Sequence, residues 1–150
     1  MTGLLVNPPI QKVIFMITEP ILDNKVREHF FSTITTQYVH FELALYYFAG
    51  SLFAEYPGTV WRCVYLDNGG RFLYPDRGRE ITITKENVTV TLDERLAGIV
   101  ATMTTISYYS LEAYGRSDDK EVESLGTLYS LLLDHVKTLP ESNLILSVLD

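Results

Sequence analysis

The sequence predicts an α+β fold in which a small antiparallel, hairpin-based sheet packs against several α-helices. Three observations support this prediction: a long amphipathic segment at 37–55, short alternating segments between 60 and 91, and two or three helical segments after residue 91. The strands follow one another through short turns and do not alternate with helices, which favours an antiparallel sheet. The 150 residues fit a single compact domain, with an N-terminal arm at 1–20 that contains one extended stretch.

The first two helices are expected between residues 23 and 55. Asp23 is a suitable N-cap for a short helix that runs to about Phe31. In the segment 37–55, helical periodicity places a set of apolar residues on one side and a more polar set on the other. The apolar side comprises Tyr38, Phe41, Leu45, Tyr46, Ala49, Leu52 and Phe53, and the polar side comprises Gln37, His40, Ala44, Tyr47, Ser51 and Glu55.

Glu42 stands out because it falls within the apolar stripe of this helix. A carboxylate in such a place must be paired or hydrogen-bonded, or it becomes neutral. Two interpretations follow. Glu42 is a buried acid anchored by Arg, Tyr, Trp or backbone N–H groups, or this side of the helix is not wholly core and Glu42 shapes a partner site.

The expected strands are grouped in two hairpins. Segments 60–66 and 71–74 flank Asn68-Gly69-Gly70, and Asn-Gly between strands predicts a tight turn in which both turn residues take positive φ. We interpret Asn68, Gly69 and Gly70 as a structural turn, in preference to a phosphate-binding backbone nest. Segments 81–84 and 88–91 alternate apolar and polar residues, as half-buried strands do, with a turn at 85–87.

The remaining segments are helical. Thr91 and Glu94 form a capping-box pattern before one helix, and Ser117 is the expected N-cap of the next. The apolar face of the first comprises Leu96, Ile99, Val100, Met103, Ile106 and Tyr114, and that of the second Val122, Leu125, Leu128, Tyr129, Leu132, Val136 and Leu139. Pro140 permits a last short helix over 141–149. The carboxylates at 118, 119, 121 and 123 stand at a helix start, where the helix dipole favours negative charge.

Charge and motifs exclude several function classes. The net charge is −7, and residues 93–150 carry ten acidic and four basic side chains. No basic stripe exists that would displace counterions from phosphate, so direct nucleic-acid binding is not expected. The sequence has no phosphate loop, dinucleotide motif or nucleophile elbow, and His29, His40, His135 and Cys63 lack metal-ligand spacing. We therefore predict no cofactor, no metal site and no catalytic residue.

Neither a disulfide nor a membrane anchor is expected. Cys63 is the single cysteine, which suits a reducing cytoplasm, and no apolar run approaches the roughly 20 residues of a membrane span.

Several motifs together resemble the ArdB/KlcA antirestriction family. They are Phe41-Glu42, then Tyr56-Pro57-Gly58-Thr59-Val60-Trp61, then the stretch 66–75 around Asn68-Gly69-Gly70, then Ala97-Gly98-Ile99, and finally the tail 140–150, which begins Pro140-Glu141-Ser142 and ends at Asp150. Arg27 matches an arginine in the family's first helix. The likeness covers about residues 22–150. The sequence departs from the family's pattern at Thr59 and Arg71, and at 106–110 it lacks an expected histidine.

The resemblance implies a monomeric cytoplasmic protein, encoded on mobile DNA such as a plasmid, phage or genomic island. Such a protein relieves Type I restriction of incoming DNA through protein interaction. Its expected partner is the Type I restriction complex or an associated host protein, and the candidate partner-binding residues are Arg27, Glu42, Trp61, Glu141 and Asp150.

Other interpretations of these residues and of the function stay open. Trp61 is also explained as plain core, and Asp150 as a solvated chain end. One alternative function is an acidic DNA mimic that inhibits a DNA-binding protein with its C-terminal third. The other is a small hydrolase whose site the motifs do not reveal.

Overall fold

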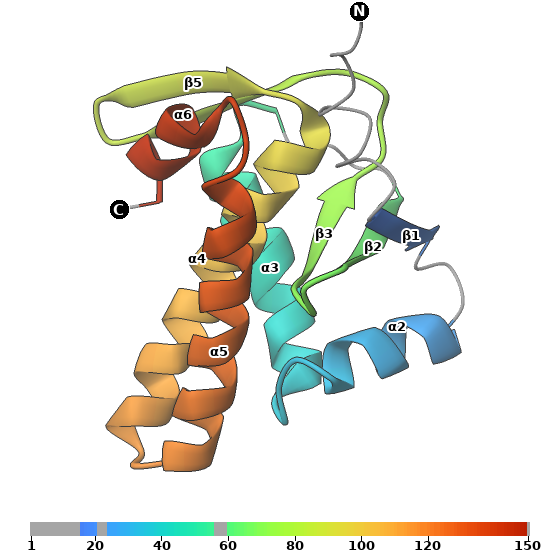
Figure 1. Cartoon of the computed structure of the whole chain (residues 1–150), viewed down its shortest axis with the longest axis vertical. Helices are drawn as coiled ribbons and strands as arrows, with labels where there is room; N and C mark the ends of the chain where they lie inside the picture. Colours follow the sequence, from blue (N-terminus) through green and yellow to red (C-terminus); the bar gives the residue numbers. More distant parts are fainter. Residues whose placement is uncertain (1–15, 21–23, 56–59, 150) are drawn as a thin grey trace, which may run out of the picture.

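The computed structural model describes residues 16–20, 24–55 and 60–149, and it confirms the α+β class (Figure 1). The elements are β1 (Met16–Pro20), α2 (Asn24–Ser32), α3 (Tyr38–Leu52), β2 (Trp61–Leu66), β3 (Arg71–Pro75), β4 (Ile81–Lys85), β5 (Val88–Leu92), α4 (Glu94–Gly115), α5 (Asp119–Val136) and α6 (Ser142–Ser147). Within these residues, no helix is long and apolar enough to cross a membrane.

The strands form two antiparallel sheets. The first has the order β1-β2-β3, and the second is the β4-β5 hairpin. Residues 16–20 therefore belong to the sheet, which accords with the extended stretch expected in the N-terminal arm, and Met16 pairs with Leu66. Figure 1 shows α4 and α5 side by side, and the three-stranded sheet lies to the right of α3 in this view.

The outer edge of β3 is covered by α4, and two small residues make this approach possible. A Cβ atom on Gly98 would lie 2.3 Å from the backbone oxygen of Leu73 and 2.4 Å from the Cβ of Tyr74. One turn further on, the Thr102 hydroxyl accepts a hydrogen bond from the backbone N–H of Leu73 at 3.1 Å. An edge strand otherwise leaves backbone N–H and C=O groups unpaired. The contact with α4 gives the Leu73 N–H a partner and covers the edge against pairing with another chain.

The β2–β3 hairpin is present, but its turn differs from the predicted type. Gly69 has φ +93°, whereas Asn68 does not take a positive φ. The Gly69 N–H donates to the Leu66 oxygen at 3.0 Å, and the Leu66 N–H donates to the Gly70 oxygen at 2.8 Å. This is a longer loop in which a turn is followed by one left-handed glycine, so a single positive φ suffices. The β4–β5 hairpin has the expected alternation, with buried Ile81, Ile83, Val90 and Leu92.

Two predicted helix caps are wrong. Thr91 lies within β5, where its hydroxyl faces that of Thr82 at 3.0 Å, so Asp93 caps α4 instead and accepts the N–H of Arg95 at 2.8 Å. Ser117 takes φ +60° as the chain leaves α4, and the next residue, Asp118, caps α5. In each case the residue expected to cap the helix belongs to the preceding segment: Thr91 lies in β5, and Ser117 lies in the turn that follows α4.

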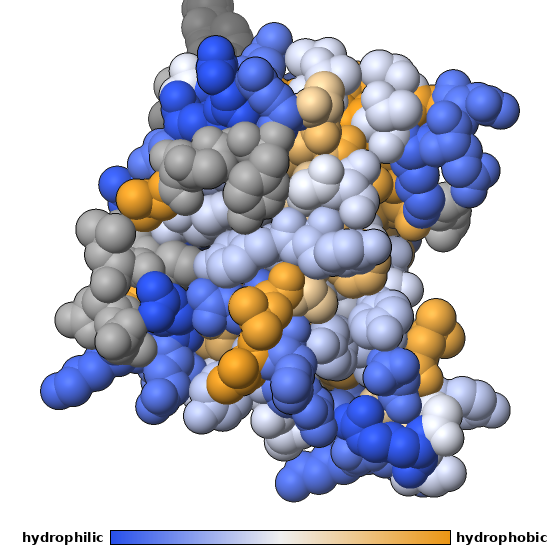
Figure 2. Space-filling model, turned by 180° about the vertical axis from the view of Figure 1, so that it is seen from behind, coloured by the Kyte–Doolittle hydropathy of each residue, from blue (hydrophilic) through white to orange (hydrophobic). Residues whose placement is uncertain are grey.

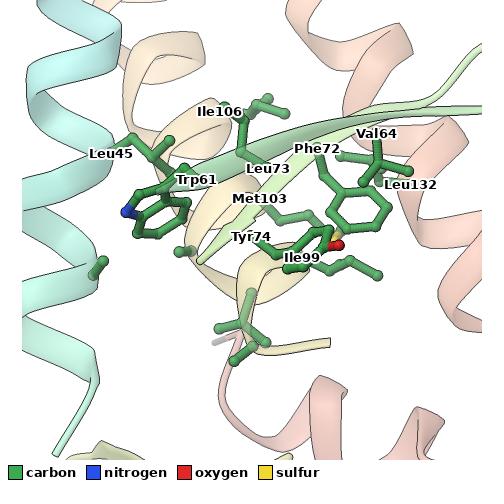
Figure 3. Packing of buried hydrophobic residues seen from close by; sticks show 14 of the residues in the cluster. Leu45, Trp61, Val64, Phe72, Leu73, Tyr74, Ile99, Met103, Ile106 and Leu132 are labelled. Carbon is green, nitrogen blue, oxygen red and sulfur yellow. The ribbon is translucent and has the colours of Figure 1, made fainter. Parts of the chain in front are cut away.

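The core lies between the helices and the sheet. Figure 3 shows Trp61 and Leu45 on the α3 side of the strands, and Val64, Phe72 and Leu132 on the α5 side. The apolar stripe of α3 is confirmed, since Phe41, Leu45, Ala49 and Leu52 are buried. Tyr114 is an exception to the predicted face of α4, because this part of the helix extends beyond the sheet and leaves the ring 75% exposed.

Candidate functional site

Arg27 and Glu42 form an ion pair between α2 and α3. The Arg27 Nε lies 3.1 Å from Glu42 Oε2, and the two side chains are 37% and 20% exposed. Glu42 is thus half-buried at the margin of the stripe, and an arginine anchors it. Glu42 therefore has the arginine anchor of the first interpretation, and part of its side chain remains exposed to solvent.

Tyr46 connects this pair to Trp61. It stands one turn after Glu42 on α3, and its hydroxyl donates a hydrogen bond to Glu42 Oε2 at 2.9 Å. Its ring lies 5.5 Å from that of Trp61, measured between centroids, and Trp61 stacks on Phe53 at 6.5 Å. Three of the predicted partner-binding residues, Arg27, Glu42 and Trp61, are therefore gathered in one network that joins α2, α3 and β2.

The network combines an accessible end and a buried end. Trp61 is 4% exposed and lies in the core, in line with its plain structural interpretation. The Arg27 and Glu42 side chains are partly exposed, although the Arg27 Nε is itself buried. A charge pair at a partly exposed place contributes little to stability.

The other predicted residues lie elsewhere or outside the described chain. Glu141 is half-buried and precedes α6, where its backbone oxygen accepts the N–H of Ile145 at 3.0 Å. Figure 1 shows α6 near the β4–β5 hairpin, at the opposite end of the molecule from α2. Asp150 lies outside the described residues, as do Tyr56, Pro57, Gly58 and Thr59 of the family-like motif.

The turn residues connect the sheet to α5 through a hydrogen bond and close packing. The Asn68 side chain accepts the N–H of Gly70 at 2.8 Å and donates its own N–H to the backbone oxygen of Leu131 at 3.0 Å. Gly70 is buried, and a Cβ atom there would lie 3.4 Å from Leu132. These contacts account for the motif structurally.

Glu121 is a buried carboxylate, whereas the sequence groups it with the other acids at the start of this helix. It is 6% exposed, and its Oε2 accepts hydrogen bonds from the Thr35 hydroxyl and from the N–H and hydroxyl of Thr36, the latter two at 3.1 and 3.3 Å. It therefore ties the α2–α3 connection to the start of α5. The signal was in the sequence, because Glu121 precedes Leu125, Leu128 and Leu132 at helical spacing on the same stripe.

Arg71, like Glu121, makes a contact between distant segments that the sequence does not predict. It is half-buried at the start of β3, where its guanidinium donates to the backbone oxygen of Thr33 at 3.1 Å. Burial lowers the pKa of Arg71, and the neighbouring Tyr65 partly offsets this effect. The residue thus helps to hold the α2–α3 connection against the sheet.

The described residues contain no cluster of three or more His, Cys, Asp or Glu side chains suited to a metal ion. Cys63 is buried in β2, whereas His29 and His40 are exposed on separate helices. The arrangement around Glu42 is one of ion pairing, a tyrosine hydrogen bond and ring packing.

Comparisons with known proteins bear on the fold and the family of the chain. No curated protein sequence matches the chain. A solved structure from work on the KlcA and ArdB proteins matches with a TM-score of 0.72 and 20% identity, over 90% of this chain and 95% of that one. That work describes a novel fold and antirestriction activity against Type I DNA restriction systems in vivo but not in vitro. The two chains share a fold.

The family itself is identified by sequence. The sequence profile of the family described as "Antirestriction protein" matches residues 54–150, which is more than half of the chain. The matched region includes β2, β3 with its turn, and all of α4, α5 and α6. The chain belongs to the antirestriction protein family.

Proposed function

We propose that this protein relieves Type I restriction of incoming DNA by contacting a protein, without catalysis and without binding DNA. The observation that carries the proposal is the family match over residues 54–150, together with a shared fold with a structure from work reporting activity against Type I systems. The direct partner is the Type I restriction complex or a host protein that works with it, and the site of action is the cytoplasm.

The charge distribution supports action on a protein. A net charge of −7 opposes contact with the DNA backbone, and the basic side chains are partly engaged in ion pairs. Arg62 pairs with Asp76 at 2.6 Å, and Arg77 pairs with Glu55 at 2.9 Å. These pairs stabilise the loops at the end of the sheet and do not form a continuous basic surface.

The structure gives less support to the DNA-mimic alternative. Of the acids expected to imitate phosphates, Glu121 is buried, and Asp118 accepts the N–H of Glu121 and lies 3.6 Å from Arg116. Asp119 and Glu123 remain exposed. These two carboxylates lie one turn apart on α5, and a single pair does not reproduce a row of phosphates, so we interpret the cluster as a helix start.

The decisive experiment is plating of unmodified phage on a Type I restricting strain with and without this protein. We expect plating to rise with the protein present, while the modification of surviving phage stays intact. Unchanged plating on hosts carrying several Type I families, with soluble protein confirmed, contradicts the proposal. A host with a Type II enzyme is the matched control and should restrict as before.

The candidate site is tested in the same assay. Arg27→Ala, Glu42→Gln and Glu141→Gln change accessible or half-buried charges, and Asp150→Asn changes the chain end. Loss of protection with an unchanged melting temperature assigns a residue to partner binding. Full protection by all four variants removes this set from the partner surface.

A further inference from the structure

The exposed side of α3 is unusually apolar for an acidic protein. Val39, Leu43 and Tyr47 are 58%, 63% and 70% exposed, and they recur every four residues along the helix. They form a ridge of the kind that packs into the groove of another helix. Helical periodicity places Tyr47 on the polar side of this helix, and the predicted apolar stripe includes neither Val39 nor Leu43.

The ridge continues onto α4. Tyr108 and Leu111 are 45% and 69% exposed. The Tyr47 ring contacts the Phe48 ring at 5.6 Å, and Phe48 contacts Tyr108 at the same distance, so a path of rings joins the two helices.

We call this surface the α3–α4 face, made of Val39, Leu43, Tyr47, Tyr108 and Leu111. The view from behind in Figure 2 shows pale and orange surface across the middle, with strongly hydrophilic surface mostly above and below.

A hollow adjoins this face at Leu111. It has a volume of about 220 Å³ and lies between α4 and α5, with Leu111 and Tyr129 among its lining residues. Ile106 and Leu125, which are fully buried, also line it. Gly126 adds no side chain, and a Cβ atom there would meet nothing within 4 Å. The hollow therefore has the size and lining to receive an apolar side chain from outside.

Glu112 adds a negative charge beside the face. It follows Leu111 and stands one turn after Tyr108. Burial raises the pKa of Tyr109, and the neighbouring Tyr108 and Glu112 add to this effect. Arg116 stands four residues further on, but its guanidinium lies 3.6 Å from Asp118 and forms its ion pair there. Among the described side chains, none forms an ion pair with Glu112.

We propose that the α3–α4 face binds a basic amphipathic helix of a partner protein, whose apolar side packs on the ridge and whose lysine or arginine pairs with Glu112. This inference rests on the proposed function, because it names the surface through which that partner is engaged. A second copy of the chain is a poorer occupant, since it would bring another Glu112 and a second net charge of −7 to a face whose five defining residues include no lysine or arginine.

A direct binding test uses two synthetic helical peptides of about 18 residues, or five turns. One combines leucine with lysine, and the other combines leucine with glutamate. We expect the purified protein to bind the lysine peptide at least tenfold more tightly, with both Leu43→Lys and Glu112→Lys weakening that binding at least tenfold. Val88→Lys changes an exposed valine on β5 to the same charged residue and should bind as the wild type does.

The same variants are then compared in the phage-plating assay. We expect Leu43→Lys and Glu112→Lys to lose at least tenfold in protection at an unchanged melting temperature, and Val88→Lys to protect fully. If the wild type itself gives no protection, the proposed function fails, whereas peptide binding still reports on the face.

Three results overturn the inference. One is full protection by both α3–α4 variants while the wild type also protects. Another is equal binding of both peptides, or binding that Leu43→Lys and Val88→Lys change equally. The third is a wild-type dimer, detected by light scattering, that Leu43→Lys dissociates, because the face would then join two copies. If Leu43→Lys lowers the melting temperature, Glu112→Lys decides the outcome.

Discussion

Gly98 is the residue whose side chain, or lack of one, most directly fixes the position of a helix. Gly98→Ala places a methyl group 2.3 Å from a backbone oxygen of β3, which cannot move aside as a flexible side chain would. We expect a loss of about 3 kcal/mol in the free energy of unfolding, at the upper end for overpacking. Urea denaturation measures it.

Gly126 provides the matched control for this substitution. It also lies within a helix, but a Cβ atom there meets nothing within 4 Å. Gly126→Ala should therefore stabilise the protein by about 0.5–1 kcal/mol, the difference in helix propensity. Equal effects of the two substitutions would refute the role of close packing at Gly98.

Glu121 is expected to matter for stability far more than its acidic neighbours. Glu121→Ala leaves the hydroxyl of Thr35 and the N–H of Thr36 without their acceptor, at a cost of about 2–4 kcal/mol, since each unmet buried donor costs about 1–3 kcal/mol. The exposed Glu123→Ala should change stability by less than about 0.5 kcal/mol. Similar melting temperatures for both variants would show that Glu121 is solvated.

Within the Glu42 network, the partly exposed ion pair should contribute less to the free energy of unfolding than the buried ring of Trp61. Glu42→Ala removes a half-exposed ion pair and one tyrosine hydrogen bond, and should cost about 1–2 kcal/mol. Trp61→Ala removes a buried ring and should cost about 3–5 kcal/mol. A double-mutant cycle with Arg27→Ala measures the ion pair directly. A coupling above about 3 kcal/mol would mean that the pair is buried in solution.

At the scale of elements, the β2–β3 hairpin is held to α5 by Asn68. Asn68→Ala removes the bond to Leu131 and the acceptor of the Gly70 N–H, and we expect a loss of about 1–2 kcal/mol. Asn68→Asp keeps that acceptor but cannot donate to Leu131, so it isolates the contact between hairpin and helix. Amide exchange at Leu66 and Gly70 should quicken in both variants. Wild-type exchange in Asn68→Asp would show that the link to α5 contributes nothing.

At the scale of the whole molecule, the negative charge governs which partners can approach. We expect no measurable affinity for duplex DNA at 50 mM salt, because counterion release needs a basic surface. Fluorescence anisotropy with a labelled duplex tests this. A micromolar affinity that falls steeply with added salt would contradict it and would turn attention to the basic residues of the loops.

The sequence by itself determined the class of fold and most of its elements. Amphipathic spacing predicted α3 and the inward face of α5, alternation predicted β4 and β5, and Asn-Gly-Gly located the first hairpin. These features depend on near neighbours along the chain, which is why local patterns reveal them. The motifs around Trp61 and the turn also led to the correct family.

Contacts between distant segments were decided only by tertiary structure. Glu42 and Glu121 both stand on apolar stripes, but only the fold sets Arg27 beside one and Thr35 and Thr36 around the other. In the same way, the caps of α4 and α5 shifted because Thr91 and Ser117 were already used by the preceding elements. The exposure of Leu43 and Tyr47 likewise depends on which neighbours the fold supplies. A pattern in the sequence states which side chains need a partner, and only the packed chain shows where one is found.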